Sequence, residues 1–331
     1  MRLSVLDQSP VAEGSTGAEA LRNTLDLATL CDVLGYHRYW VAEHHGGPSL
    51  AGPSPEVLIG PIASVTSRMR IGSGGVMLPH YSPLKVAESF CVLSGLFPDR
   101  IDLGIGRASG TDPLTTFALQ RDRRDTAPDD FPQQLAELRA YLDGTLPPDH
   151  VFKRLEASLV GPDRPHLWLL GSSLQSAVWA AQLGLPYSFA DFINPGGSEI
   201  AGHYAQACTA EPRVMVAAWV ICADTDEEAQ RLASSSRMTL ALLRQGRLVP
   251  VPPVEKALRF LETQGGAGSS GGRRAIIGSP PKVRARIEEL AADYGAEEVM
   301  VVTITHSHAA RRRSYELIAD EFALAPSSKA A

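Results

Sequence analysis

The sequence predicts a (β/α)₈ barrel, and three observations lead to it. The chain has 331 residues, a length at which α/β barrels commonly fold as one domain. Eight short apolar segments recur along it, with amphipathic helical patterns between them. These segments are continuously apolar rather than alternating, as expected for parallel strands that are covered on both faces. We therefore expect one barrel domain over residues 1–331, with a doubly wound open sheet as the alternative.

The predicted strands recur along the whole chain. Each is a run of mostly apolar residues bounded by polar residues, glycine or proline. They cover residues 2–6, 38–43, 70–78, 100–106, 166–171, 186–190, 213–223 and 297–305.

Helical patterns lie between these strands. The first runs from about residue 18 to 34 and ends at Gly35, a residue suited to the left-handed conformation that closes a helix. Ser82-Pro83 and Ser279-Pro280 each resemble an N-cap followed by proline in the first turn, so a helix should begin at each. Further helices are expected from about residue 55 and over residues 173–183.

Two stretches interrupt the pattern. Residues 107–130 are charged and polar without an apolar period, and residues 244–274 include the run QGGAGSSGGRR. A Gly/Ser-rich composition packs poorly, so we expect residues 244–274 to form a flexible insertion after the seventh strand. A mobile loop at that place would act as a lid over an active site, and an inert insertion is the alternative.

Composition and charge narrow the class of protein. The formal net charge of −6 argues against nucleic acid as a partner. No stretch approaches a transmembrane span in length, and the N-terminus has no apolar signal segment, so we expect a cytoplasmic protein without membrane attachment. The cysteines have neither CxxC nor zinc spacing and lie in apolar segments, which favours buried thiols in a reducing compartment. They are Cys31, Cys91, Cys208 and Cys222.

Glu43, His44 and His45 follow the second predicted strand at its carboxyl end, where functional residues of barrels gather. Adjacent strand residues point to opposite faces, so only one of the two histidines can face the barrel interior. This weakens a shared metal site, although His306 and His308 offer a second pair after the last strand. The remaining interpretations are one histidine as an acid, a base or an orienting group, and a structural strand end.

An anion site is predicted where the fourth and fifth strands end. Arg107 directly follows a strand, and its guanidinium can form a bidentate contact with phosphate. The opposite side would be the start of the helix at 173–183, with its exposed N–H groups and hydroxyls. Its candidate residues are Gly171, Ser172, Ser173 and Ser176. Ordinary helix capping by the serines is the alternative, and Gly278-Ser279 is a rival phosphate site.

Three glycines interrupt the third strand, in GSGGVM at residues 72–77. Glycine weakens a strand and often marks a bulge or the close approach of a flat ligand. A planar cofactor against Gly74-Gly75 is one interpretation, and a packing kink is the other.

Together these segments resemble the bacterial luciferase-like superfamily of flavin-dependent monooxygenases. The resemblance covers nearly the whole chain, in the superfamily's order, and rests on four stretches: GYHRYWVAEHH, RIGSGGVMLPHYSPLKVAE, RIDLGIGRASG and LLGSSLQSAVWAAQLGLP. It implies a (β/α)₈ barrel that binds reduced FMN, usually as a homodimer.

The resemblance also assigns roles. His44 matches the active-site histidine that acts as a base beside the flavin, with Glu43 and His45 as candidates for orienting it. Gly74 and Gly75 match a pair joined by a non-proline cis peptide bond under the isoalloxazine. The group that holds the flavin phosphate is matched by Arg107, Ser172, Ser173 and Ser176. One departure is Gly106, because the luciferases carry a reactive cysteine there, which puts light emission in doubt.

The implied activity is that of a two-component monooxygenase. A separate NAD(P)H:flavin reductase would supply FMNH₂, and O₂ would oxygenate an organic substrate such as a secondary-metabolite or polyketide intermediate. Three alternatives stay open: a deazaflavin (F420)-dependent oxidoreductase on the same fold, a non-catalytic flavin-binding protein, and a metal-dependent hydrolase built on the four histidines.

Overall fold

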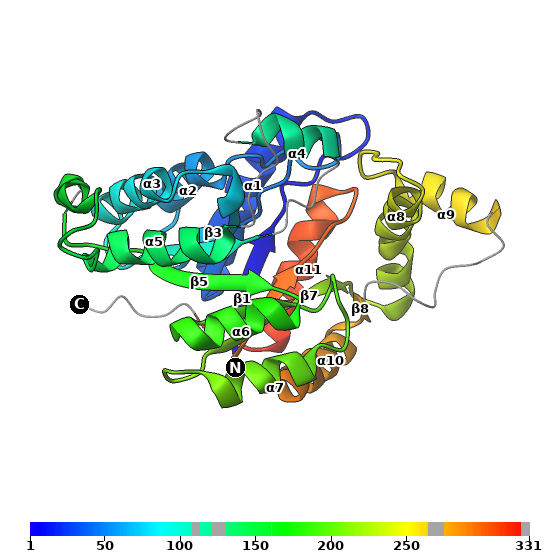
Figure 1. Cartoon of the computed structure of the whole chain (residues 1–331). Helices are drawn as coiled ribbons and strands as arrows, with labels where there is room; N and C mark the ends of the chain where they lie inside the picture. The colour runs from blue at the N-terminus through cyan, green and yellow to red at the C-terminus, as the bar shows by residue number, and fades with distance from the viewer. Residues whose placement is uncertain (108–112, 121–129, 160, 264–274, 326–331) are drawn as a thin grey trace.

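The computed structural model describes residues 1–107, 113–120, 130–159, 161–263 and 275–325. Its strands all run parallel and form one sheet (Figure 1). They are β1 (Arg2–Asp7), β2 (Arg38–Val41), β3 (Arg70–Met77), β4 (Ile101–Gly106), β5 (His166–Gly171), β6 (Tyr187–Ala190), β7 (Val214–Cys222), β8 (Ala275–Gly278) and β9 (Glu298–Val302).

Helices connect these strands and cover the outside of the sheet. They are α1 (Gly17–Leu34), α2 (Pro55–Val65), α3 (Pro83–Leu96), α4 (Pro113–Leu119), α5 (Phe131–Asp143), α6 (Leu174–Leu183), α7 (Ser198–Ala207), α8 (Asp226–Arg244), α9 (Val254–Thr263), α10 (Pro280–Tyr294) and α11 (His308–Glu321), with short 3₁₀ turns at Leu78–His80 and Lys153–Ser158. Among the described residues, no helix is long and apolar enough to cross a membrane.

Eight of the strands close into a barrel, as the sequence predicts. The ring runs β1-β2-β3-β4-β5-β6-β7-β9 and closes where β9 pairs with β1. The remaining strand, β8, lies outside the ring. It pairs with the last four residues of β7, Trp219 to Cys222. The pairing of β7 with β9 ends at Trp219, which pairs with Val302. The eight barrel strands are those predicted from the sequence, and β8 was not predicted.

Alternate residues of the barrel strands face the helices and the interior. On β2, Tyr39 and Val41 belong to the large core between strands and helices, whereas Trp40 belongs to a smaller apolar cluster inside the barrel. We call this group the inner cluster. It consists of Leu6, Trp40, Ala42, Trp168, Phe192, Met215, Ala217, Met300 and Val302.

Several local expectations can be compared with the structure. Gly35 closes α1 in the left-handed conformation with φ 93°, and Ser82 and Ser279 stand at the N-caps of α3 and α10. Parts of the two irregular stretches are helical, because α4 falls within residues 107–130 and α9 within 244–274. The glycine-rich run at 264–274 lies outside the described residues, so its role as a lid stays a prediction.

The cysteines also differ in one respect from the expectation. Cys31, Cys91 and Cys222 are buried free thiols, as predicted. Cys208 is only half-buried, because it follows the last residue of α7 rather than lying on a strand.

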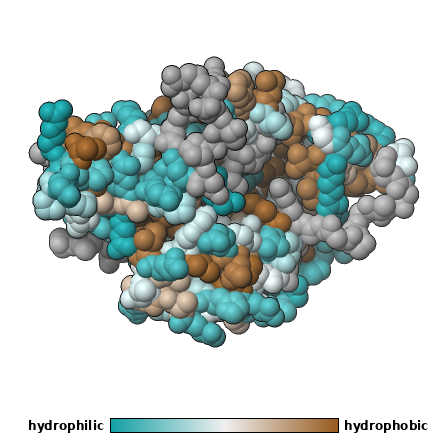
Figure 2. Space-filling model, viewed as in Figure 1, coloured by the Kyte–Doolittle hydropathy of each residue, from teal (hydrophilic) through white to brown (hydrophobic). Residues whose placement is uncertain are grey.

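Two surface features surround the barrel opening. Figure 1 shows α8 and α9 standing to one side of the barrel, and α4 near the loops that follow β1 and β2. The apolar side chains of Leu114 and Phe117 on α4 are exposed. Figure 2, in the same view, shows a brown area near its upper edge, where α4 lies in Figure 1.

Candidate functional site

The carboxyl ends of the barrel strands meet on one face of the molecule, which we call the mouth. Parallel strands in a closed barrel all end on the same side. The predicted functional residues follow the neighbouring strands β2, β3, β4 and β5, or end them. The topology therefore brings all four predicted groups to the mouth.

The side chains of Glu43 and His45 lie together at the end of β2. His45 Nε2 is 2.7 Å from Glu43 Oε1. His44 lies between them in sequence and continues the alternation of Trp40 and Ala42, which are both in the inner cluster. The backbone of His44 is held by a hydrogen bond of 3.0 Å from its N–H to the carbonyl of Gly52. Strand β2 ends at Val41, two residues earlier than predicted, so the inward position of His44 stays a prediction from this pattern.

Glu43 joins the end of β2 to the segment after β3. Its buried carboxylate accepts hydrogen bonds of 2.8 Å from the Met77 N–H and 2.8 Å from the Tyr81 hydroxyl, in addition to the contact with His45. Burial, together with the charge of Glu43, raises the pKa of Tyr81, so this phenol stays a donor. Glu43 therefore acts here as a structural anchor behind His44.

The Gly74-Gly75 peptide bond is cis. A Cβ on Gly74 would lie 2.5 Å from Leu6 Cδ1, and one on Gly75 would lie 2.7 Å from the Gly104 carbonyl oxygen. Packing alone therefore requires glycine at both positions. The packing interpretation is therefore confirmed. The planar cofactor against this stretch of bare backbone stays a prediction.

Gly106, at the end of β4, is different. A Cβ there would meet no atom of the described residues within 4 Å. Among these residues, no packing contact requires the glycine that stands in place of the luciferase cysteine.

The serines at the start of α6 are held in a capping box. The Ser173 hydroxyl accepts from the Ser176 N–H at 3.3 Å, and the Ser176 hydroxyl donates to the Ser173 carbonyl at 2.7 Å. Ser176 is buried and also lies 2.9 Å from the Tyr187 hydroxyl, whose pKa burial raises to about 12. Ordinary capping is therefore confirmed. It uses the Ser176 N–H, so the N–H groups of the first two residues of α6 and the half-buried Ser172 are the candidates left for an anion.

Arg107 lies beside this helix. Its guanidinium carbon is 5.5 Å from the centre of the Trp179 ring, and Trp179 lies in the second turn of α6. The positive side chain after β4 thus contacts the same helix whose N-terminus is the other half of the predicted anion site, so the anion site itself stays a prediction. The rival site at Gly278-Ser279 is filled by protein, because the Asp226 carboxylate accepts from the Ser279 N–H at 2.7 Å.

The four histidines do not converge. His306 Nε2 lies 3.3 Å from the Glu13 carbonyl oxygen, and His308 Nε2 lies 2.7 Å from Asp26 Oδ2 on α1. Within the described ranges, no group of three or more His, Cys, Asp or Glu side chains could hold a metal ion.

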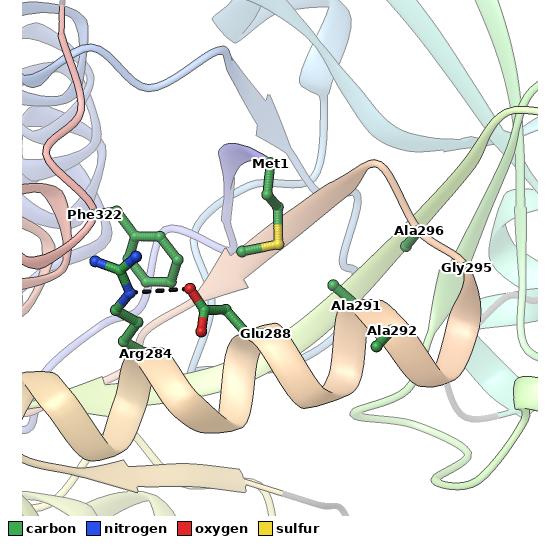
Figure 3. Close-up of a pocket in the computed structure, with 8 residues that line it drawn as sticks. All are labelled: Met1, Arg284, Glu288, Ala291, Ala292, Gly295, Ala296 and Phe322. Atoms are coloured by element: carbon green, nitrogen blue, oxygen red, sulfur yellow. Dashed lines mark hydrogen bonds and ion pairs between the residues drawn. The ribbon is translucent and has the colours of Figure 1, made fainter.

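A hollow of about 450 Å³ lies far from the mouth (Figure 3). Met1 precedes β1 and Ala296 precedes β9, so the hollow is at the opposite end of the barrel. Arg284 beside it pairs with Glu288 at 2.9 Å and stacks on Phe322. These groups satisfy one another and offer no reactive side chain.

Comparison with known proteins decides the family. The model of the family described as luciferase-like monooxygenase matches residues 1–298. The chain belongs to this family. It is 44% identical over 330 residues to the uncharacterized protein YwcH of Bacillus subtilis, with 97% of this chain and 99% of that protein covered. It is 37% identical over 328 residues to the N-acetyl-S-alkylcysteine monooxygenase of the same organism, with 97% and 98% covered.

A solved structure agrees over the whole fold. The crystal structure of apo-MsnO8 is 43% identical and superposes with a TM-score of 0.90, covering 98% of this chain and 99% of that chain. The protein is accordingly an enzyme, a flavin-dependent monooxygenase of the luciferase-like family.

The residues at the mouth fit a flavin. A phosphate suits the pair formed by Arg107 and the α6 N-terminus, and a flat ring suits the side-chain-free backbone at Gly74-Gly75. Sequence reasoning missed Tyr81 and Asp226. Tyr81 stands in the quoted stretch after β3, but its partner is 38 residues away, so no local pattern reveals the contact.

Proposed function

We propose that the protein is the oxygenating component of a two-component FMN-dependent monooxygenase. FMNH₂ from a separate NAD(P)H:flavin reductase would supply two electrons. One atom of O₂ would enter an organic substrate, and the other would leave as water. The observation that carries this proposal is the contact between the Arg107 guanidinium and the Trp179 ring of α6, which supports a phosphate site made of Arg107 and the first turn of that helix.

Residues of this chain have distinct tasks in the proposal. Arg107 and the first turn of α6 bind the phosphate, and the bare backbone at Gly74-Gly75 supports the ring. His44 holds or moves a proton beside the reacting atoms. Histidine suits this role because its ordinary pKa is about 6.5. The space at Gly106 admits a bulky substrate of the secondary-metabolite or polyketide kind.

Fold alone does not choose between cofactors. Solved structures that share the fold at 20% identity or less include the oxygenating constituent of 3,6-diketocamphane monooxygenase in complex with FMN (TM-score 0.74) and an F420-dependent secondary alcohol dehydrogenase (TM-score 0.71). The relatives that favour the monooxygenase are closer in sequence, at 37% and 39% identity.

The test is reconstitution with each cofactor. The purified protein should bind FMN, and with FMNH₂ and a panel of aldehydes, sulfonates and aromatic polyketides it should consume O₂ and transfer ¹⁸O from ¹⁸O₂ to a product. With NAD(P)H and FMN alone it should consume no O₂ until a flavin reductase is added. Binding of F420 but not FMN, without O₂ consumption, would contradict the proposal.

Gly171→Ala should weaken FMN binding roughly 10- to 100-fold, the equivalent of one or two charge-assisted hydrogen bonds. An added Cβ would lie 2.2 Å from Ser176 Oγ and 2.5 Å from Ser176 Cβ, so the first turn of α6 must move. Gly202→Ala on α7 is the matched control, because a Cβ there meets nothing within 4 Å. Equal FMN dissociation constants for the two variants, measured by flavin fluorescence, would contradict this use of the α6 N-terminus.

We also propose a homodimer that buries one face of α2 and α3. These neighbouring helices expose Val57, Val65, Val92 and Leu96 to solvent, and exposed apolar patches often mark interfaces. Light scattering should give twice the chain mass of 35.4 kDa. Leu96→Glu should shift the mass toward that of the monomer, whereas Val151→Glu, at an exposed valine outside these helices, should leave it unchanged. A monomeric wild type would contradict the proposal.

A further inference from the structure

Trp219 is the last inward-facing residue of β7 that still pairs with the barrel. It pairs with Val302 of β9, and beyond it β7 pairs with β8 instead. Met215 and Ala217, two and four residues earlier, belong to the inner cluster, and Trp219 packs against the same cluster. The indole therefore stands inside the rim of the mouth.

The back of this indole is held in place. Trp219 also packs against a second apolar cluster, which contains Ile221 of β7, Ala229 and Leu232 of α8, and Val254 of α9. Helices α8 and α9, which stand to one side of the barrel in Figure 1, thus hold the side chain from behind. A large aromatic side chain fixed in this way is a rigid wall rather than a mobile one.

The polar edge of Trp219 has no partner. Its Nε1 atom is buried and meets no hydrogen-bond acceptor among the described residues, although the residue as a whole is only half-buried. By contrast, Trp40 Nε1 donates to Asp102 Oδ2 at 2.9 Å. A buried donor without an acceptor is costly, so such a group at a partly open site points to a ligand.

Trp168 gives the comparison within the same molecule. Its Nε1 is also buried without an acceptor among the described residues. However, Trp168 is only 2% exposed and is enclosed by Trp40, Arg38 and Arg213. Trp219 is thus partly exposed, whereas Trp168 is enclosed on all sides by protein.

The topology places Trp219 on the side of the mouth that the flavin leaves open. In the eight-stranded ring, β7 is four strands from β3 in either direction, so Trp219 lies across the mouth from Gly74-Gly75. The phosphate site lies on β4 and β5. If the flavin occupies β3 to β5, as in the proposed function on which this step rests, the space before Trp219 belongs to the organic substrate.

We propose that Trp219 determines substrate specificity by donating its Nε1–H to an oxygen acceptor of the substrate while its ring packs against an apolar part. The substrate class is accordingly a flat or bulky apolar molecule that carries a carbonyl or other acceptor oxygen. An aromatic wall combined with one placed donor is the usual composition of a small-molecule site.

The test uses two probes of the same shape. In 2-isopropenylnaphthalene a CH₂ group replaces the carbonyl oxygen of 2-acetylnaphthalene, so only the acceptor differs. Binding is measured by equilibrium dialysis with oxidised FMN present and no reductant, in the wild type, Trp219→Phe and Trp168→Phe. The wild type should prefer the ketone by about fivefold, the usual effect of one neutral hydrogen bond. The preference should fall to about one in Trp219→Phe and persist in Trp168→Phe.

Three results would overturn the inference. They are equal binding of the two probes by the wild type, binding of neither probe, and a preference for the ketone that survives in Trp219→Phe. A loss of FMN affinity in Trp219→Phe, with the ketone preference unchanged, would assign the N–H to the cofactor. Failure of FMN binding in all variants would instead count against the proposed function, because the probe preference can be measured without FMN.

Discussion

Replacing His44 with alanine is expected to lower the rate of substrate oxygenation by roughly 10²- to 10⁴-fold, the usual contribution of a positioned acid or base. The loss should appear in kcat and not in the FMN dissociation constant, because the proposed phosphate site at Arg107 and α6 follows other strands. Single-turnover product formation with FMNH₂ and O₂ measures the first quantity, and flavin fluorescence the second.

The neighbouring histidine is the matched control. His45 bonds to the buried Glu43, so we expect it to support the site without facing it. His45→Ala should therefore lower kcat much less than His44→Ala. If the two variants lose equal activity, or if His44→Ala leaves product formation unchanged, the assignment of His44 as the proton-handling residue is wrong.

The barrel was predictable because its signal is local. Each barrel strand is a continuous apolar run, and the eight predicted runs are the eight strands of the ring. The strand β8 escaped prediction because AIIG is only four residues long and lies between a glycine-rich run and Ser279-Pro280. Helix α9 escaped although Val254, Ala257, Leu258 and Leu261 recur at helical spacing, because the glycine-rich run that follows dominates the composition of residues 244–274.

The site was predictable only in part, because its strand ends are local features of the sequence but the contacts between its side chains are not. Strand ends can be read from the sequence, and barrel geometry brings them together, so His44, Arg107 and the start of α6 reach one face. The partners of these residues come from distant segments. Glu43 binds the Met77 N–H, 34 residues away, and Asp226 caps the helix that begins after Ser279, 53 residues away. Such contacts depend on the packing of whole elements and leave no pattern within a sequence window.

The second large effect is expected at the other end of the barrel, where Arg38 is buried between two carboxylates. Its guanidinium donates to Asp102 Oδ2 at 2.6 Å and to Glu298 Oε1 at 2.6 Å. Arg70 and Trp40 also donate to Asp102, at 2.8 and 2.9 Å. The cluster joins β2, β3, β4 and β9, so it links strands on both sides of the β1–β9 closure.

Arg38→Met should lower the free energy of unfolding by about 3–5 kcal/mol, because it leaves two carboxylates buried without their shared cation. Arg2→Met is the control. It removes the ion pair between Arg2 and Glu297, whose N–O distance of 2.7 Å is close to those of Arg38. Both side chains of this pair are exposed, so the loss of unfolding free energy should stay below about 1 kcal/mol. Denaturant unfolding measures both, and similar losses for the two variants would show that Arg38 is not the charge that stabilises this cluster.

The pH dependence of the same variants gives an independent check. Burial raises the pKa of Asp102, but Arg38 and Arg70 outweigh it and hold the pKa below its ordinary value. A lowered pKa in the folded state means that the unfolded chain takes up the proton first, so the wild type loses this stability as the pH falls. Without Arg38 much of that lowering is removed, so the difference in unfolding free energy between wild type and Arg38→Met should narrow as the pH falls below about 4, the ordinary pKa of an aspartate, toward the lowered pKa of Asp102. A difference that stays constant over this range would mean that the loss comes from packing against Trp168 and not from the unpaired charge.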